Sequence, residues 1–143
     1  MRSLPATLTK PAPRSEPQKV VLDSFAWIEY FSGSLRGEKV RQFVEDGNAT
    51  TPTIVIAEVS EKYARMKLDP EPRLVFIVAR SGTVVLDEEL ARTAGRLNYE
   101  RKRTVKGWGM TDSIILASAR RCEAKVVTGD PHFKDLRSET IMI

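Results

Sequence analysis

Cysteine, histidine and long hydrophobic runs are scarce in this chain of 143 residues. The single cysteine, Cys122, excludes an internal disulfide framework and favours a reducing compartment. It falls in an apolar helical pattern, so we expect a buried core residue rather than a reactive thiol. The single histidine, His132, excludes a histidine-rich zinc site and is expected to be a surface or loop residue.

No apolar stretch approaches the ~20 residues that cross a bilayer. The N-terminal segment MRSLPATLTK also lacks the continuous apolar core of a signal peptide. We therefore expect a cytoplasmic protein that does not associate with a membrane.

Charge is present in moderate excess of one sign, because the net charge is +4. Residues 92–106 alone carry an excess of five positive charges, because one acid stands against six basic residues: Arg92, Arg96, Arg101, Lys102, Arg103 and Lys106. Such a run is either a solvated helix face or a surface that binds a polyanion, and the pattern alone leaves both open.

The chain divides into a Pro-rich tail, 1–18, which we expect to be disordered, and one domain, 19–143. Short apolar or β-branched runs predict strands at 20–22, 83–86, 125–128 and 140–143, and residues 50–51 predict either a brief strand or a turn. Helical spacing predicts helices at 24–31, 35–45, 53–67, 71–80, 87–101 and 112–121. This alternation predicts an α/β fold, a parallel sheet with helices on both faces.

Carboxylates accompany apolar runs in four separate segments: VVLDSF, IVIAEV, MTDSII and VVTGDP. The acids are Asp23, Glu58, Asp112 and Asp130. Asp23 and Asp130 each follow a predicted strand, and ligands of parallel sheets gather beyond the carboxyl ends of the strands. Burying several carboxylates together is costly unless a cation neutralises them. The set therefore predicts a Mg²⁺ or Mn²⁺ site.

Each acid also has a purely structural explanation. Asp23 and Asp112 could cap helices, Asp130 could be a turn residue, and Glu58 could face solvent. Two hydroxyls next to the acids, those of Ser24 and Thr128, could hydrogen-bond to a carboxylate or to a metal-bound water, or serve only in capping and strand formation.

These four segments, in this order, resemble a PIN domain, and in particular the VapC toxins of VapBC toxin–antitoxin pairs. The resemblance runs from Val20 to the C-terminus and rests on Asp23-Ser24, Glu58, the helix-start Asp112 and the segment 128–133, Thr-Gly-Asp-Pro-His-Phe. It implies a Rossmann-like sheet, a divalent-metal site formed by the four acids, and endonucleolytic cleavage of RNA.

The resemblance also implies partners. A VapB-type antitoxin would insert a segment, often with a basic side chain, into the acidic cleft, and the toxin would form a homodimer. Amphipathic faces on 24–31 and 71–80 could supply that interface or belong to the core. Other family members mature ribosomal RNA or act in RNA decay, so a role other than a toxin stays open.

RNA contacts are expected from Arg101, Lys102 and Arg103, whose cations would bind phosphates without reading bases. Trp108 could stack on an unpaired base, although we favour a packing role between its flanking glycines. Two rivals remain: a PIN-like module that binds RNA or protein without cleaving, and a receiver-like phosphoacceptor domain. A receiver-like domain would have paired acids after its first strand and a lysine after its last. This chain fits poorly, because its first strand is followed by Asp-Ser and its last motif lacks a lysine.

Overall fold

The computed structural model describes residues 17–143, so most of the predicted tail lies outside the described residues. Five parallel strands form one sheet in the order β3-β2-β1-β4-β5. Their bounds are β1 Val20–Leu22, β2 Ala49–Pro52, β3 Gly82–Val84, β4 Lys125–Thr128 and β5 Thr140–Met142. The four predicted strands are confirmed, with β3 displaced by one or two residues, and the segment at 50–51, predicted as a strand or a turn, is part of strand β2.

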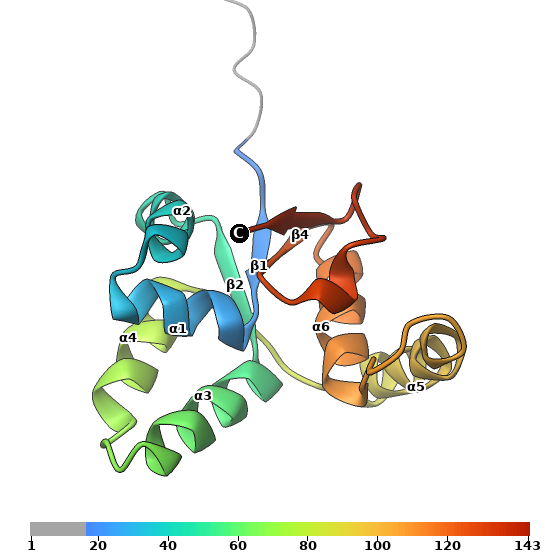
Figure 1. The fold of residues 1–143 in the computed structure, drawn as a ribbon, viewed down its shortest axis with the longest axis horizontal. Coiled ribbons are helices and arrows are strands. Elements are labelled where there is room, and N and C mark those ends of the chain that lie inside the picture. Colours follow the sequence, from blue (N-terminus) through green and yellow to red (C-terminus); the bar gives the residue numbers. More distant parts are fainter. Residues whose placement is uncertain (1–16) are drawn as a thin grey trace, which may run out of the picture.

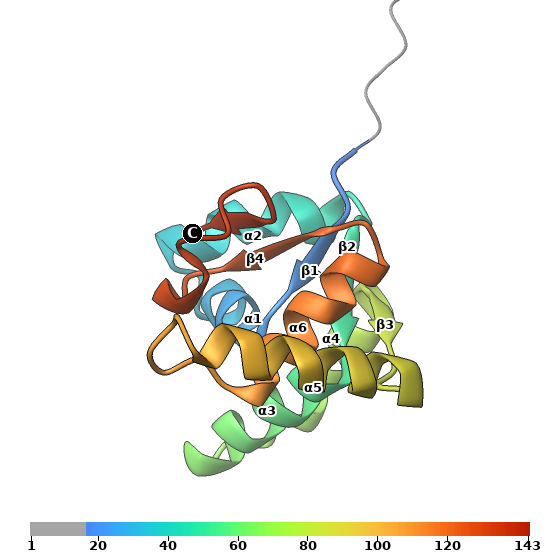
Figure 2. The same ribbon diagram turned by 90° about the vertical axis from the view of Figure 1, so that its right-hand side faces the viewer.

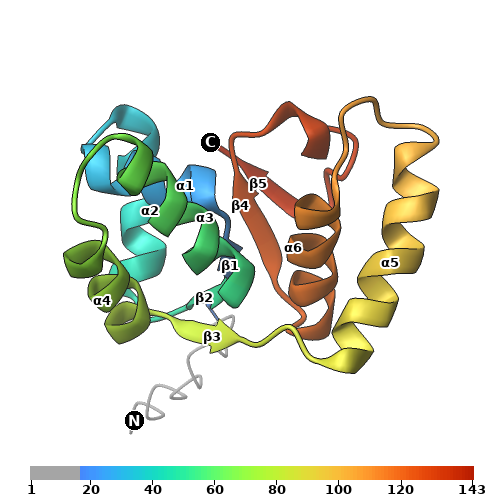
Figure 3. The same ribbon diagram turned by 90° about the horizontal axis from the view of Figure 1, so that it is seen from below.

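Six α-helices connect these strands: α1 Ser24–Ser32, α2 Leu35–Glu45, α3 Thr53–Arg65, α4 Glu71–Arg80, α5 Glu88–Lys102 and α6 Met110–Arg121. A short 3-10 helix, η1 (Pro131–Phe133), joins β4 to β5. Helices α1–α4 lie on one side of the sheet and α5 and α6 on the other (Figures 1 and 3). The view onto α5 shows it outside α6, with the sheet behind (Figure 2). The predicted α/β architecture is confirmed.

The direction of the chain through the sheet reverses next to β1. Strands β2 and β3 are added on one side of β1, and β4 and β5 on the other. Helices change faces at the same place, so the carboxyl ends of β1 and β4 flank the point where a parallel sheet forms its ligand crevice.

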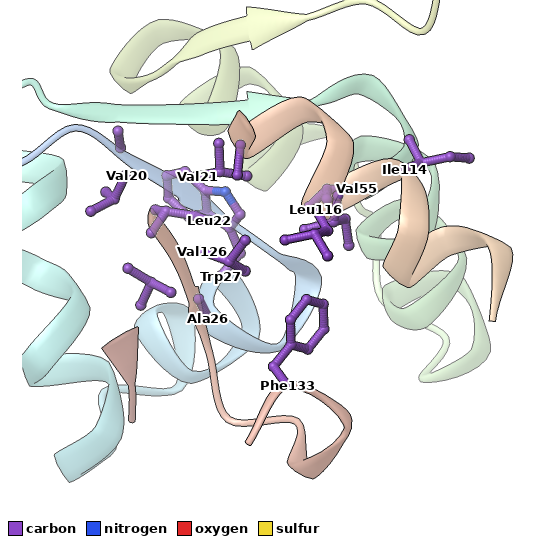
Figure 4. Close-up of a cluster of buried hydrophobic side chains, with 14 of the residues drawn as sticks. Val20, Val21, Leu22, Ala26, Trp27, Val55, Ile114, Leu116, Val126 and Phe133 are labelled. Carbon is purple, nitrogen blue, oxygen red and sulfur yellow. The ribbon is translucent and has the colours of Figure 1, made fainter. Parts of the chain in front are cut away.

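The hydrophobic core surrounds β1, whose three residues are completely buried. Figure 4 shows these side chains gathered with Trp27, Leu116 and Val126, from α1, α6 and β4. The indole N–H of Trp27 donates to Thr51 Oγ1 at 3.0 Å, which ties α1 to the strand beside β1. Because both sides of the β1/β4 pair are packed, residues at its carboxyl end are held in place.

Cys122 departs from expectation. Helix α6 ends at Arg121, and Cys122 is its C-terminal cap, followed by Glu123 in the left-handed region (φ 52°). The thiol is half-buried rather than part of the core. Cys122 was predicted to be a core residue because the apolar pattern of the sequence continues past Arg121, where the helix itself ends.

Candidate active site

Asp23 lies between β1 and α1, with its side chain almost completely buried at 4% exposure. Its Oδ1 accepts a 2.8 Å hydrogen bond from the N–H of Ala26, so it does cap the helix. Burial raises the pKa of Asp23 to about 7, against the lowering effect of the Thr128 hydroxyl and the Ala26 N–H. The nearby carboxylates of Glu58 and Asp130 add to the rise.

Glu58 approaches from α3, on the helical side of the sheet opposite α6. Its Oε1 is buried and has no hydrogen-bond partner within residues 17–143. Burial raises the pKa of Glu58, and the carboxylates of Asp112, Glu61 and Asp130 raise it further, while the hydroxyl of Ser24 opposes them. Glu58 therefore does not face solvent as an ordinary helix residue would.

Asp112 and Asp130 complete the acidic group. Helix α6 begins two residues before its predicted start, so Asp112 lies in its first turn and accepts a 3.0 Å hydrogen bond from the N–H of Gly109. Burial raises the pKa of Asp112, and the carboxylate of Asp130 adds to this. Asp130 is held by two short-range bonds: its N–H donates to Thr128 Oγ1 at 2.9 Å, and its Oδ1 accepts from the N–H of His132 at 2.9 Å.

All four acids line one pocket of about 270 Å³ at the carboxyl ends of β1 and β4. Ser24, Phe25, Ile28, Glu61, Lys62, Arg65 and Ile115 complete its lining. The structure thus brings the four predicted acids and Ser24 together. Thr128 is completely buried. Its hydroxyl hydrogen-bonds to the side chain of Asp23 and accepts a hydrogen bond from the backbone N–H of Asp130.

A second hollow, of about 330 Å³, lies between α1 and α2 and is a weaker candidate. Its charged residues already neutralise one another, because Arg41 pairs with Glu45 at 2.8 Å and with Glu38 at 3.5 Å. The acidic pocket differs in that none of its four acids forms a salt bridge with a lysine or arginine of the described chain.

The donor set fits a divalent cation. Buried carboxylates raise one another's pKa here and include an oxygen without a partner, as expected where an added positive charge is needed. Within residues 17–143, one compact group of ligand atoms lies within 4.8 Å of one another, and it comes from Asp112, Asp130 and His132. Asp23 and Glu58 line the same pocket outside this compact group.

Arg101 has a structural role that changes the prediction for the basic segment. Its guanidinium binds both oxygens of Asp135, at 2.6 and 2.9 Å, and lies 4.3 Å from the centre of the Trp108 ring. With its side chain only 12% exposed, Arg101 is not placed to bind a phosphate. Lys102 and Arg103 are exposed, but neither lines the acidic pocket.

Trp108 is a packing residue, as favoured from the sequence. It is 1% exposed, donates from its indole N–H to Ser113 Oγ at 2.7 Å, and packs against the ring of Phe133, 4.9 Å away between centres. An unpaired base therefore has no access to it.

Three residues beside the four acids were not among the predicted site residues: Lys62, Arg65 and His132. The two cations line the pocket from α3, four and seven residues after Glu58, which is the spacing of one helix face. That signal was present in the sequence. His132 had no comparable signal, since its position depends on the turn after β4.

The family comparison agrees with this geometry. Residues 20–139 match the PIN domain family. The chain belongs to this family. No curated protein matches the chain in sequence.

Solved structures share the PIN fold across nearly their whole length. A toxin–antitoxin complex from Klebsiella pneumoniae has a chain 18% identical to this one, with a TM-score of 0.68 over 87% of this chain and 97% of that chain. VapBC2 from Rickettsia felis, bound to a DNA fragment from its promoter, has a chain 16% identical to this one, with a TM-score of 0.69 over 88% of this chain and 98% of that chain. VapC20 from Mycobacterium tuberculosis, a toxin that cleaves the sarcin–ricin loop, is 13% identical, with a TM-score of 0.63 over 82% of this chain and 95% of that chain. At these identities the likeness establishes the fold.

No helix within residues 17–143 is long and apolar enough to cross a membrane.

Proposed function

We propose that this chain is a divalent-metal-dependent endoribonuclease, the VapC-type toxin of a toxin–antitoxin pair. The observation that carries the proposal is the set of four carboxylates around one pocket with no lysine or arginine paired to them. A structural role alone would favour paired or exposed acids, since unpaired buried carboxylates destabilise a fold.

Asp23, Glu58, Asp112 and Asp130 would hold the cation, Mg²⁺ or Mn²⁺. When bound, such a cation activates water for attack and offsets negative charge on the phosphate. The chain keeps these carboxylates rigid: β1 and the cap of α1 fix Asp23, and the Thr128 hydroxyl fixes the backbone of Asp130. The Oε1 atom of Glu58, which has no hydrogen-bond partner among the described residues, would be free to accept a hydrogen bond from a water molecule in the pocket.

RNA would reach the acids past the two cations on α3. Lys62 and Arg65 are exposed and line the pocket, so they are placed to bind phosphates next to the scissile one. Lys102 and Arg103, on the opposite side of the sheet, would extend this contact only for a long RNA. Arg101 is not among the proposed phosphate-binding residues, because its guanidinium forms an ion pair with Asp135.

A homodimer and a bound VapB-type antitoxin are part of the same proposal, and α4 offers a surface for such contacts. Val75 and Val78 are 64% and 55% exposed on this helix, and with Leu74 and Ala79 they line an open apolar hollow. The other amphipathic segment, α1, places Trp27 and Phe31 against the core and is less available. Replacing Val75 and Val78 together by glutamate should reduce association, measured by the mass of the protein in solution.

The direct test is cleavage of transfer, ribosomal and messenger RNA by the untagged chain, freed of any partner, with Mg²⁺ or Mn²⁺. Asp112→Asn should lose cleavage, while Asp46→Asn, an equivalent change at the exposed end of α2, should retain it. Binding of RNA without cleavage at any metal concentration would favour the non-catalytic module. Growth arrest on expression of the wild type but not of Asp112→Asn would distinguish a toxin from a maturation enzyme.

A further inference from the structure

His132 lies next to the acidic pocket with its side chain 35% exposed, yet the Nδ1 atom of its ring is buried and has no hydrogen-bond partner among the described residues. Its Nδ1 is 3.3 Å from Asp130 Oδ1 and 3.5 Å from Asp112 Oδ2. That nitrogen is buried and has no hydrogen-bond partner within the part of the chain that the structure describes. An unsatisfied buried nitrogen between two carboxylates needs a physical explanation.

The imidazole is held in this position from several sides. The backbone N–H of His132 donates a hydrogen bond to Asp130 Oδ1, and the guanidinium of Arg101 donates one to the backbone carbonyl of His132 at 3.2 Å. The next residue, Phe133, is completely buried and anchors the turn. On its far side the ring lies against Gly107, where a Cβ would be 2.7 Å from Nε2. Gly107, at φ +85°, thus leaves room for the ring.

The geometry points to a role for this nitrogen as a ligand: we propose that His132 binds the divalent cation of the site through Nδ1, beside Asp112 and Asp130, and that the site therefore prefers Mn²⁺ to Mg²⁺. The inference rests on the proposed metal site and extends it to a residue outside the four acids. Adjacent ligands of an octahedral ion with bonds of about 2.1 Å are about 3 Å apart, close to the two distances observed.

The metal preference follows from ligand chemistry. Mg²⁺ favours oxygen ligands and gains little from imidazole, whereas first-row transition metals accept nitrogen readily. A site with carboxylates alone would discriminate weakly between Mg²⁺ and Mn²⁺. Adding one imidazole nitrogen shifts the preference toward Mn²⁺, and further toward Co²⁺.

The opposing explanation is that His132 acts as a built-in cation that neutralises Asp112 and Asp130. In that case His132 competes with the metal, and its removal strengthens the binding of every divalent ion. The two explanations therefore predict opposite changes in affinity.

The test measures Mg²⁺ and Mn²⁺ affinities by calorimetry on the full untagged chain, for the wild type, His132→Gln and Glu61→Gln. His132→Gln should lower Mn²⁺ affinity by about tenfold or more and Mg²⁺ affinity much less. Glu61→Gln removes a charge from the same pocket without removing the nitrogen, so it should weaken both ions alike. Thermal unfolding checks that each variant is folded, and His132→Asn serves as a second variant.

A spectroscopic readout is available because the chain has one histidine. In ¹⁵N-histidine-labelled protein, Zn²⁺ should shift the Nδ1 resonance of His132 to the value of a metal-bound nitrogen. An unchanged Mn²⁺/Mg²⁺ affinity ratio in both His132 variants, or tighter binding of both ions, would overturn this inference and leave the metal site standing. Failure of the wild type to bind any divalent ion would overturn the proposed function with it.

Discussion

Two groups of acids in this protein live in opposite electrostatic surroundings. At the surface, Asp87 accepts hydrogen bonds from the two terminal guanidinium nitrogens of Arg121, at 2.7 and 2.9 Å, and these bonds lower the pKa of Asp87 to about 2. In the pocket, burial raises the pKa of Asp23 to about 7. Both residues cap a helix. A helix-capping aspartate thus occurs both with an arginine partner and without one, and Asp23, which has none, shares its pocket with three further acids that pair with no lysine or arginine.

This difference in surroundings means that the two groups of acids have opposite effects on the stability of the folded state. Surface acids such as Asp87 and Glu139 are paired with arginines and favour the folded state. Three of the pocket acids, Asp23, Glu58 and Asp112, disfavour the folded state in their charged form, because Asp23 is buried and the other two are half-buried beside like charges. A site of this kind is expected where a bound cation supplies the missing charge.

The largest expected effect comes from removing one pocket acid. Asp112→Asn or Asp23→Asn should reduce RNA cleavage by about a hundredfold or more, because each change weakens the hold on the cation. Cleavage rates measured for every variant at the metal concentration that just saturates the wild type test this. Folding should survive in both, since each substitution relieves repulsion among the carboxylates, and near-wild-type cleavage by either variant would contradict the account.

The cations on α3 should have the next largest effect. Lys62→Ala with Arg65→Ala should weaken RNA binding by about tenfold and flatten its dependence on salt, because two phosphate contacts are lost. Binding measured from low to moderate salt provides both values. The matched control is Lys102→Ala with Arg103→Ala on α5, for which a smaller loss is expected; an equal or larger loss would move the RNA path to that side of the sheet.

Stability should depend on pH in opposite directions for the two groups. Asp23 binds its proton more tightly in the folded chain, so its contribution to stability is full below about pH 4 and is lost as the pH rises through 7. Asp87 contributes above about pH 4 and loses its contribution as the pH falls through 2.

Thermal unfolding without metal, followed from pH 2 to 8, separates these contributions. Asp23→Asn should remove part of the decline toward pH 8, and Asp87→Asn part of the loss in acid. A decline between pH 5 and 8 that is the same in wild type and Asp23→Asn would show that this carboxyl is not shifted.

The smallest effects should come from the arginine pairs. Arg101→Ala should destabilise the fold by about 2 kcal/mol, because it removes hydrogen bonds to a carboxylate and a contact over Trp108. Arg120→Ala, which breaks a more exposed pair with Glu139, should cost less. Chemical denaturation measures both values, and an equal loss for the two would place Arg101 among ordinary surface pairs.

Much of the fold could be predicted because local patterns determine it here. Short apolar runs such as VVL before Asp23 form buried strands, and Asp87 caps its helix as its sequence indicates. Boundaries were less certain where tertiary contacts decide them: α6 begins at Met110, with Gly109 as its cap, rather than at Asp112.

The acids of the site could also be predicted, because each follows or interrupts an apolar segment and the sheet brings them together. The roles of Arg101 and His132 could not. Arg101 finds Asp135 across 34 residues, and His132 reaches the acids only because η1 and Gly107 position its ring. The composition of the basic segment therefore could not show that Arg101 is held by Asp135, and the RNA contacts predicted for Lys102 and Arg103 stay predictions.

The central claim is that Asp23, Glu58, Asp112 and Asp130 pair with no lysine or arginine because together they bind a divalent cation. Thermal unfolding of the untagged chain at pH 8, with and without Mn²⁺, tests it most directly, with Asp112→Asn and Asp46→Asn measured alongside. Mn²⁺ at about 100 times its dissociation constant should stabilise the wild type and Asp46→Asn by about 2.7 kcal/mol. The same concentration should have little effect on Asp112→Asn. No stabilisation of the wild type, or an equal rise in Asp112→Asn, would contradict the account.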